Sequence, residues 1–384
     1  MKSFRLQLPT RVRFGLDCIS ELPGLVALWG GVALVVTDQE LAHRTDIPDR
    51  VLTQLREYGV ETACFSEVSC NPRLATVRRG RDAARRHQCR VIVGLGGGSA
   101  LDAAKGIAAP DSTRDALPLI AVPTTAGSGS EVTPYAVFTV SRDARIHKEI
   151  HTDPSLYPHL ALLDPRLTVT APPAVTIDSG LDALTHALES YTSRRSRAVA
   201  TVLAEEAVRR IITALPAAYR QPRDLRARTS LLYASLLAGM CISQTGTTIV
   251  HSLSYPLTCE LGLSHGRANA ILLPVVCDYN APADIPRFAR LACLFHPEAS
   301  QLRPVEAARR LGTLIRRFLR KLDLPACLPG TPPSEEDLAR FASGTLTSER
   351  RLTSNPRRPT ESDLQSIYRR LFSPSTPPES QGHS

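Results

Sequence analysis

The segment Arg90-Val-Ile-Val-Gly-Leu-Gly-Gly-Gly-Ser-Ala-Leu-Asp-Ala-Ala-Lys105 decides how the first half of this 384-residue chain folds. Its first six residues form an apolar run typical of a buried strand, and a helix-forming stretch follows the glycines. Glycines at such a turn let phosphate oxygens approach backbone N–H groups, and the helix N-terminus favours their charge. We therefore predict a phosphate-binding turn, with a ligand-free packing turn as the alternative. The pattern departs from the GxGxxG fingerprint, because Ser99 stands where that motif has its third glycine.

Similar segments extend this pattern in both directions. Residues 31–38, 117–122 and 159–164 are apolar runs that predict buried parallel strands, and residues 47–58 and 75–88 have helical spacing. This alternation predicts a parallel sheet with helices on both faces. After Ala171-Pro-Pro173 the pattern is helical as far as Leu371. We predict an α/β nucleotide-binding domain over 1–172, an all-helical domain over 173–372, and a disordered tail over 373–384.

A second glycine- and hydroxyl-rich segment, Pro123-Thr-Thr-Ala-Gly-Ser-Gly-Ser-Glu131, follows the strand predicted at 117–122. Its amides and hydroxyls suit a diphosphate or a nicotinamide amide. Two such loops after two parallel strands favour a nucleotide across the carboxyl ends of the sheet over a polar surface loop. Asp38 ends the first strand, where its carboxylate would accept a hydrogen bond from a ribose 2′-hydroxyl. This position favours NAD and leaves NADP open.

Four side chains in the predicted helical half have the chemistry of metal ligands. Asp182 and His186 are four residues apart, so they project from one face of a helix, and His251 and His265 come from another segment. Pro256 is predicted to interrupt the helix that carries His251. An Asp/His set suits a borderline divalent metal, Fe²⁺ or Zn²⁺, in a closed structural site or an open Lewis-acid site. A nucleotide held by the other half favours the open site.

Composition narrows the class of protein. The net charge is +9, but acidic residues are mixed among the arginines and aromatic residues are only 5% of the chain, which favours solvated helix faces over a nucleic-acid surface. Nine cysteines without a CxxC pair indicate a reducing compartment. The N-terminal residues carry no apolar signal segment, and no apolar run reaches membrane-spanning length. We expect a cytoplasmic protein with no nucleic-acid or membrane partner, and a homodimer as the commonest closed oligomer.

Together these motifs resemble the iron-containing (group III) alcohol dehydrogenase family. The resemblance extends along nearly the whole chain and rests on Asp38, Asn71-Pro72, Gly96-Gly-Gly-Ser99 with Asp102 and Lys105, Pro123 to Glu131, Asp164-Pro165, Asp182 to Glu189, Val250-His251, His265-Gly-Arg-Ala-Asn269 and Asn355-Pro-Arg357. It implies an N-terminal nucleotide-binding domain and a C-terminal helical domain that binds a divalent metal, usually iron or zinc.

The same resemblance implies roles for single residues. The metal ligands would be Asp182, His186, His251 and His265. The cofactor diphosphate and nearby groups would be held by Gly97, Gly98, Ser99, Thr124 and Thr125, with Asp38 and Asn71 at the adenosine end. We also assign four further residues to the cofactor-binding set: Gly96, Asp102, Ser128 and Lys148.

The expected reaction is hydride transfer between NAD(P)(H) and a small alcohol or aldehyde. Tyr255 is a candidate proton relay, and Arg267 is a candidate contact for an anionic substrate. One alternative is therefore a reductase of an anionic aldehyde or keto acid, of the phosphonoacetaldehyde or maleylacetate type. A second is a dehydroquinate-synthase-like lyase, in which NAD is recycled.

Overall fold

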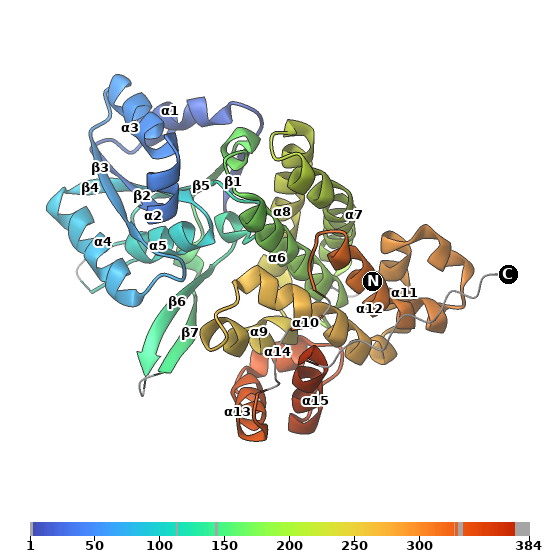
Figure 1. Cartoon of the computed structure of the whole chain (residues 1–384). Coiled ribbons are helices and arrows are strands. Elements are labelled where there is room, and N and C mark those ends of the chain that lie inside the picture. The colour runs from blue at the N-terminus through green and yellow to red at the C-terminus, as the bar shows by residue number, and fades with distance from the viewer. Residues whose placement is uncertain (1–2, 113, 143–144, 326, 329–332, 373–384) are drawn as a thin grey trace. The chain divides into compact units, whose positions relative to one another are not determined.

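The computed structural model describes residues 3–112, 114–142, 145–325, 327–328 and 333–372 (Figure 1). It divides into two compact units, which are described separately. The first unit comprises residues 1–190 and 196–246, and the second comprises 191–195 and 247–384, each within the described residues. The tail predicted over 373–384 lies outside the described residues.

The first unit contains a six-stranded sheet in the order β1-β8-β5-β4-β2-β3. Every neighbouring pair is parallel, and the central strand β4 pairs Gly96 with Pro123 of β5. The carboxyl ends of β2, β4 and β5 therefore lie at one edge of the sheet. The strands are β1 (Arg11–Phe14), β2 (Val32–Asp38), β3 (Thr62–Val68), β4 (Cys89–Gly96), β5 (Leu119–Pro123) and β8 (Leu160–Leu163).

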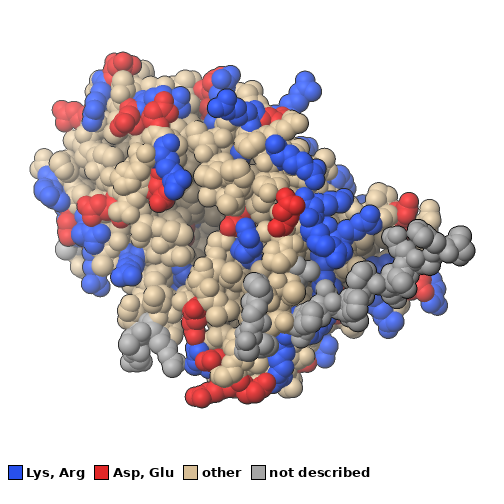
Figure 2. All heavy atoms as spheres, in the orientation of Figure 1, with Lys and Arg blue, Asp and Glu red and all other residues tan. Residues whose placement is uncertain are grey.

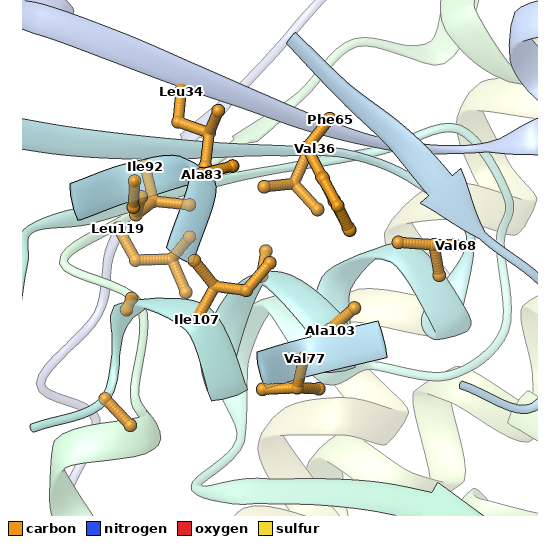
Figure 3. Close-up of a cluster of buried hydrophobic side chains, with 14 of the residues drawn as sticks. Leu34, Val36, Phe65, Val68, Val77, Ala83, Ile92, Ala103, Ile107 and Leu119 are labelled. Atoms are coloured by element: carbon orange, nitrogen blue, oxygen red, sulfur yellow. The ribbon is translucent and has the colours of Figure 1, made fainter. Parts of the chain in front are cut away.

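Both faces of this sheet are covered by helices. On one face, Leu34 and Ile92 pack against α4 (Leu74–Arg86) and α5 (Gly98–Ala108), and Figure 3 shows Ile107 of α5 inside this core. On the other face, alternate strand residues such as Val35 pack against α1 (Leu22–Ala27) and α3 (Ile47–Glu57). Since successive side chains of a strand point to opposite faces, one apolar run supplies both cores.

The remaining elements of the first unit follow the sheet or lie between its strands. A short helix α2 (Gln39–Arg44) begins directly after β2. The antiparallel hairpin β6 (Tyr135–Arg142) and β7 (Arg145–Thr152) comes after β5, and Figure 1 shows it as a separate two-stranded ribbon. Three long helices end the unit: α6 (Pro173–Thr192), α7 (Ala198–Arg220) and α8 (Leu225–Thr245).

The second unit is helical throughout its described residues. Its buried side chains recur every three or four residues, as in Leu311, Ile315 and Leu319. The Tyr368 hydroxyl donates to the Leu253 carbonyl at 2.9 Å and ties the last helix to the first. The helices are α9 (Ile249–Cys259), α10 (His265–Asn280), α11 (Ile285–Phe295), α12 (Pro304–Arg320), α13 (Glu335–Leu346), α14 (Glu349–Ser354) and α15 (Glu361–Phe372).

The fold class predicted from the sequence is confirmed: a parallel sheet with helices on both faces comes first, and a helical region follows. Among the described residues, no helix combines the length and the apolar character that crossing a bilayer requires. Basic and acidic side chains are interspersed over most of the face shown in Figure 2.

The core between the sheet and α5 yields a stability prediction. Ile107→Ala removes three carbons from a fully buried position, so the free energy of unfolding should fall by about 2–5 kcal/mol. Val202→Ala, at an exposed position on α7, is the control and should change it by less than about 0.5 kcal/mol. Calorimetric melting of both variants checks the difference. Equal melting temperatures would contradict the packing shown for Ile107.

Candidate active site

The two glycine-rich loops meet at the carboxyl edge of the sheet. The Thr124 N–H donates to the Gly96 carbonyl at 3.0 Å, which continues the pairing of β4 with β5 into the loops. A Cβ atom built on Gly98 would lie 2.9 Å from the Cβ of Ser128. One built on Gly97 would lie 3.4 Å from the Thr125 hydroxyl. The structure therefore brings together six residues that the sequence assigned to the cofactor.

Asp38 and Gly96 form a second contact at the same edge. Gly96 has φ +149°, a backbone conformation that other residues rarely adopt. A Cβ atom there would also lie 2.6 Å from Asp38 Oδ2, so only glycine fits this position. Asp38 Oδ1 accepts from the Leu41 N–H at 2.8 Å, which makes Asp38 the N-cap of α2. Partial burial raises the pKa of Asp38. Asp38 therefore has a structural function in addition to the ribose contact that remains a prediction.

Asn71, Ser99 and Lys148 form a connected polar chain beside the first loop. The Asn71 N–H donates to the Ser99 hydroxyl at 3.2 Å, and Lys148 Nζ donates to Asn71 Oδ1 at 2.6 Å. Lys148 Nζ also donates to the Thr139 hydroxyl at 3.2 Å. Asn71 has φ +60°, a conformation that asparagine tolerates better than most residues. These contacts place three residues that are far apart in the sequence next to the N-terminus of α5.

A buried group of charged residues lies behind the loops. Lys105 Nζ donates to the carbonyls of Thr133 and Tyr135 at 2.9 and 2.7 Å. Asp102 accepts from the Ser130 hydroxyl at 2.6 Å and from the Val137 N–H at 2.9 Å. Burial lowers the pKa of Lys105 to about 8 and raises the pKa of Asp102. Asp102 is half-buried and holds the second loop through Ser130, while its contact with a cofactor stays a prediction.

Glu131 belongs to the same buried group and was given no role by the sequence. Its side chain is buried, and burial raises its pKa to about 7 against the opposing effect of Lys105. The sequence did mark Lys105 and Glu131 as unusual, because each is a charged residue among small, apolar or hydroxyl residues. Their burial could not be inferred, since it depends on the contacts that residues 130–137 make with α5.

Two metal-ligand candidates lie on α6 in the first unit. Asp182 Oδ1 and His186 Nε2 are 3.7 Å apart, and both side chains are buried. Four residues make slightly more than one helical turn, so the two side chains project from the same face as predicted. The pair offers one oxygen and one nitrogen donor to a common position.

The other two candidates lie in the second unit. His251 is buried on α9, and His265 is the first residue of α10, directly after the break between the two helices. The two rings are 5.2 Å apart, and the Nε2 atom of each lies 3.3 Å from Asn269 Nδ2. Both Nε2 atoms therefore face the same position.

The prediction for Pro256 is wrong, because α9 continues through it to Cys259. Proline removes only the N–H that would bond the carbonyl four residues earlier, which a packed helix tolerates.

Tyr255 and Arg351 adjoin His265. The Tyr255 ring stacks on the His265 ring at 6.2 Å between centroids, and its hydroxyl accepts from Arg351 Nη2 at 2.7 Å. Arg351 was not singled out from the sequence, because it stands in a charged run that is typical of a solvated helix. Arg267 follows His265 by two residues on α10, and residues at that spacing do not share a helix face. Its role as a substrate contact stays a prediction.

The buried carboxyl of Glu131 leads to a pH prediction. Its pKa of about 7 in the folded chain exceeds the 4.5 of an exposed glutamate, so the folded state binds this proton more tightly. The stabilisation is complete below pH 4.5 and is lost as pH rises toward 7. Glu131→Gln should therefore gain melting temperature relative to the wild type across this interval, as measured by calorimetry. The exposed Glu57→Gln is the control, and parallel pH profiles for Glu131→Gln and wild type would contradict the assignment.

Comparison with known proteins agrees with this geometry along the whole chain. Residues 9–165 match the family model described as iron-containing alcohol dehydrogenase, and residues 176–372 match the C-terminal model of the same family. The 1,3-propanediol dehydrogenase of Klebsiella pneumoniae is 35% identical over 94% of this chain and 96% of its own length. The NAD-dependent methanol dehydrogenase of Bacillus methanolicus is 33% identical over 88% of this chain and 91% of its own.

Solved structures give the same result. A crystal structure of a 1,3-propanediol oxidoreductase superposes with a TM-score of 0.90 at 34% identity and covers 97% of this chain and 100% of its own. An alcohol dehydrogenase from Oenococcus oeni superposes with a TM-score of 0.90 at 27% identity, covering 96% of this chain and all of its own. The chain therefore belongs to the iron-containing alcohol dehydrogenase family and is an oxidoreductase of alcohols and aldehydes.

Proposed function

We propose that this chain interconverts a small alcohol and its aldehyde with NAD(H), at a divalent metal held by Asp182, His186, His251 and His265. The observation that carries the proposal is the arrangement of these donors as two prepared pairs. Within each pair the donor atoms face a common position, as described for Asp182 with His186 and for His251 with His265. Joining the two pairs at one ion completes an Asp/His₃ set.

The chemistry of the donors fits Fe²⁺ or Zn²⁺. Imidazole nitrogens with one carboxylate oxygen suit borderline divalent metals, and the choice between them depends largely on availability. Three of the proposed ligand side chains, Asp182, His186 and His251, are buried. We propose iron, with zinc as the alternative. A bound ion would supply Lewis-acid polarisation of the substrate oxygen.

The chain's own residues would bind and orient the other reactant. A nicotinamide cofactor supplies the hydride, so the protein needs to hold it in register with the substrate carbon. Gly97, Gly98 and Ser99 present backbone N–H groups at the N-terminus of α5, where negative phosphate charge is favoured. Thr124, Thr125 and Ser128 adjoin that turn from the second loop.

The adenosine end would lie near Asp38, Asn71 and Lys148. A carboxylate at the end of β2 accepts from a ribose 2′-hydroxyl and repels a 2′-phosphate, so we propose NAD as the preferred cofactor. Tyr255 remains our candidate for proton transfer, since its ring stacks on the ring of the proposed ligand His265.

The two alternative functions receive less support. Both halves match alcohol dehydrogenase models, which does not favour a dehydroquinate-synthase-like lyase. The two relatives are named for the neutral alcohols propanediol and methanol. Their names give no support to a reductase of the phosphonoacetaldehyde or maleylacetate type.

Removing one proposed ligand tests the metal site. His265→Ala should reduce bound metal from about one ion per chain to a small fraction of that and abolish NADH oxidation by propanal, because three donors remain. Plasma emission spectrometry and a spectrophotometric assay with NADH and NADPH measure both effects. His87→Ala changes an exposed histidine and serves as the control. Full activity of the wild type after removal of metal by a chelator would refute the proposal.

The contact between the two loops tests the cofactor site. In Gly98→Ala the new methyl group meets Ser128, so the dissociation constant for NADH should rise about 10-fold or more, a loss of about 1.4 kcal/mol. Adding Ser128→Gly to the same chain should restore part of the affinity. Fluorescence titration of NADH measures both variants, and Gly344→Ala, where a methyl group meets no atom, is the control. Unchanged NADH affinity in Gly98→Ala would place the cofactor elsewhere.

A further inference from the structure

Arg351 of α14 is a cation whose hydrogen-bond partners are hydroxyl groups. Its Nε donates to the Thr247 hydroxyl at 3.0 Å, its Nη1 to the Ser252 hydroxyl at 3.4 Å, and its Nη2 to the Tyr255 hydroxyl at 2.7 Å. All three acceptors are neutral. Within the described residues, Arg351 makes no ion pair with a carboxylate, and its side chain is half-buried.

Other arginines of the second unit are held by carboxylates. Arg340 binds both carboxylate oxygens of Glu260, Arg358 pairs with Glu349, and Arg369 pairs with Glu335. Arg340 is half-buried like Arg351, but Arg351 is held by hydroxyls. Partial desolvation of a guanidinium without a counter-charge is unfavourable, and an anion in that position would relieve it.

The position of Arg351 connects this cation to the reacting centre. Its guanidinium carbon lies 5.0 Å from the centroid of the Tyr255 ring, and the same ring stacks on His265 at 6.2 Å between centroids. Two successive ring contacts therefore link the cation to a proposed metal ligand. A small aldehyde with its carbonyl oxygen at the metal and its chain on the Tyr255 side would direct its far end toward Arg351.

We infer that Arg351 is a specificity-determining residue that binds an anionic group, a carboxylate in the simplest case, at the far end of the aldehyde or alcohol substrate. This inference rests on the proposed function and deepens it. The guanidinium has five N–H donors, and three are used by hydroxyls, so two remain within the described residues for a carboxylate. The net charge of +9 would attract such a substrate.

Arg351 fits this role better than Arg267, the cation that the sequence suggested. Arg267 leaves α10 two residues after His265 and therefore projects from a different side of the helix. Arg351 comes from another helix, α14, and contacts the same Tyr255 ring that stacks on His265.

The test compares an anionic aldehyde with a neutral one of the same shape in the metal-loaded enzyme with NADH. 4-Oxobutanoate should have a higher kcat/KM than 4-methylpentanal in the wild type. Arg351→Gln should lower the ratio of the two kcat/KM values about 10- to 100-fold, chiefly through KM for the anion, because a charge-assisted pair is lost. Arg351→Lys keeps the charge without the planar fork and should retain part of the preference.

The matched control is Arg357→Gln. Arg357 also lies over a tyrosine, 4.3 Å from the ring of Tyr279, but Tyr279 is 14 residues after His265 on α10, or about 21 Å along the helix. This variant should leave the ratio unchanged. A purely structural Arg351 would instead lower the kcat/KM of both aldehydes equally together with the melting temperature, and that result would overturn the inference.

Calorimetry supplies a measurement that does not depend on turnover. Butanoate should bind the wild-type enzyme more tightly than butanamide, and Arg351→Gln should remove the difference. Equal binding of the two compounds by the wild type overturns the inference, even if a variant fails to fold. Reduction of 4-methylpentanal without any preference for 4-oxobutanoate overturns it while leaving the proposed function intact. If neither aldehyde is reduced, the proposed function fails, and the binding comparison still decides the role of Arg351.

Discussion

The burial of one ammonium group, that of Lys105, is the constraint on which the nucleotide half of this protein depends. Removing a charge from water costs several kcal/mol unless oxygen atoms and opposite charges replace the solvent. Here the carbonyls of Thr133 and Tyr135 replace it, and Asp102 and Glu131 supply opposite charge. These partners come from two segments, so satisfying the lysine fixes α5 against the start of β6. The glycine turn before α5 and the second loop are then held in register.

The four proposed metal ligands are positioned in two different ways. A separation of four residues on α6 aligns Asp182 with His186 without any further contact, since it follows from the pitch of the helix. His251 and His265 have no such relation in sequence. α9 ends at Cys259 and α10 begins at His265. Asn269, one turn further along α10, contacts both rings.

Much of this could be predicted from the sequence, and the failures have physical causes. The strands β2, β4, β5 and β8 were predicted because they are buried on both faces and so appear as unbroken apolar runs. β3 was not, since its burial alternates and its polar residues interrupt the run. The β6–β7 hairpin was missed for a similar reason: β7 carries Arg145, His147, Lys148, Glu149 and His151 among its eight residues.

The candidate site shows the same division. Motifs located within one segment, such as the two glycine loops, could be recognised from the sequence, and the structure brings them together. Contacts between distant segments were not, and Arg351 is the clearest case, because its partners Thr247, Ser252 and Tyr255 lie about a hundred residues earlier. Pro256 shows the opposite error. The tendency of proline to end a helix was given more weight than the packing that keeps α9 helical as far as Cys259.

If Asp38 contacts the cofactor ribose, as we propose, its second role as the N-cap of α2 restricts how cofactor preference could change during evolution. One oxygen of its carboxylate caps α2, and the other lies against the space that only a glycine at position 96 leaves open. A lineage moving toward a 2′-phosphorylated cofactor would need to lose the negative charge without losing the cap. Serine and asparagine satisfy both conditions, whereas alanine removes the cap at a cost of about 1 kcal/mol. Few substitutions of Asp38 could therefore change the cofactor preference, because the new residue must also stabilise the N-terminus of α2.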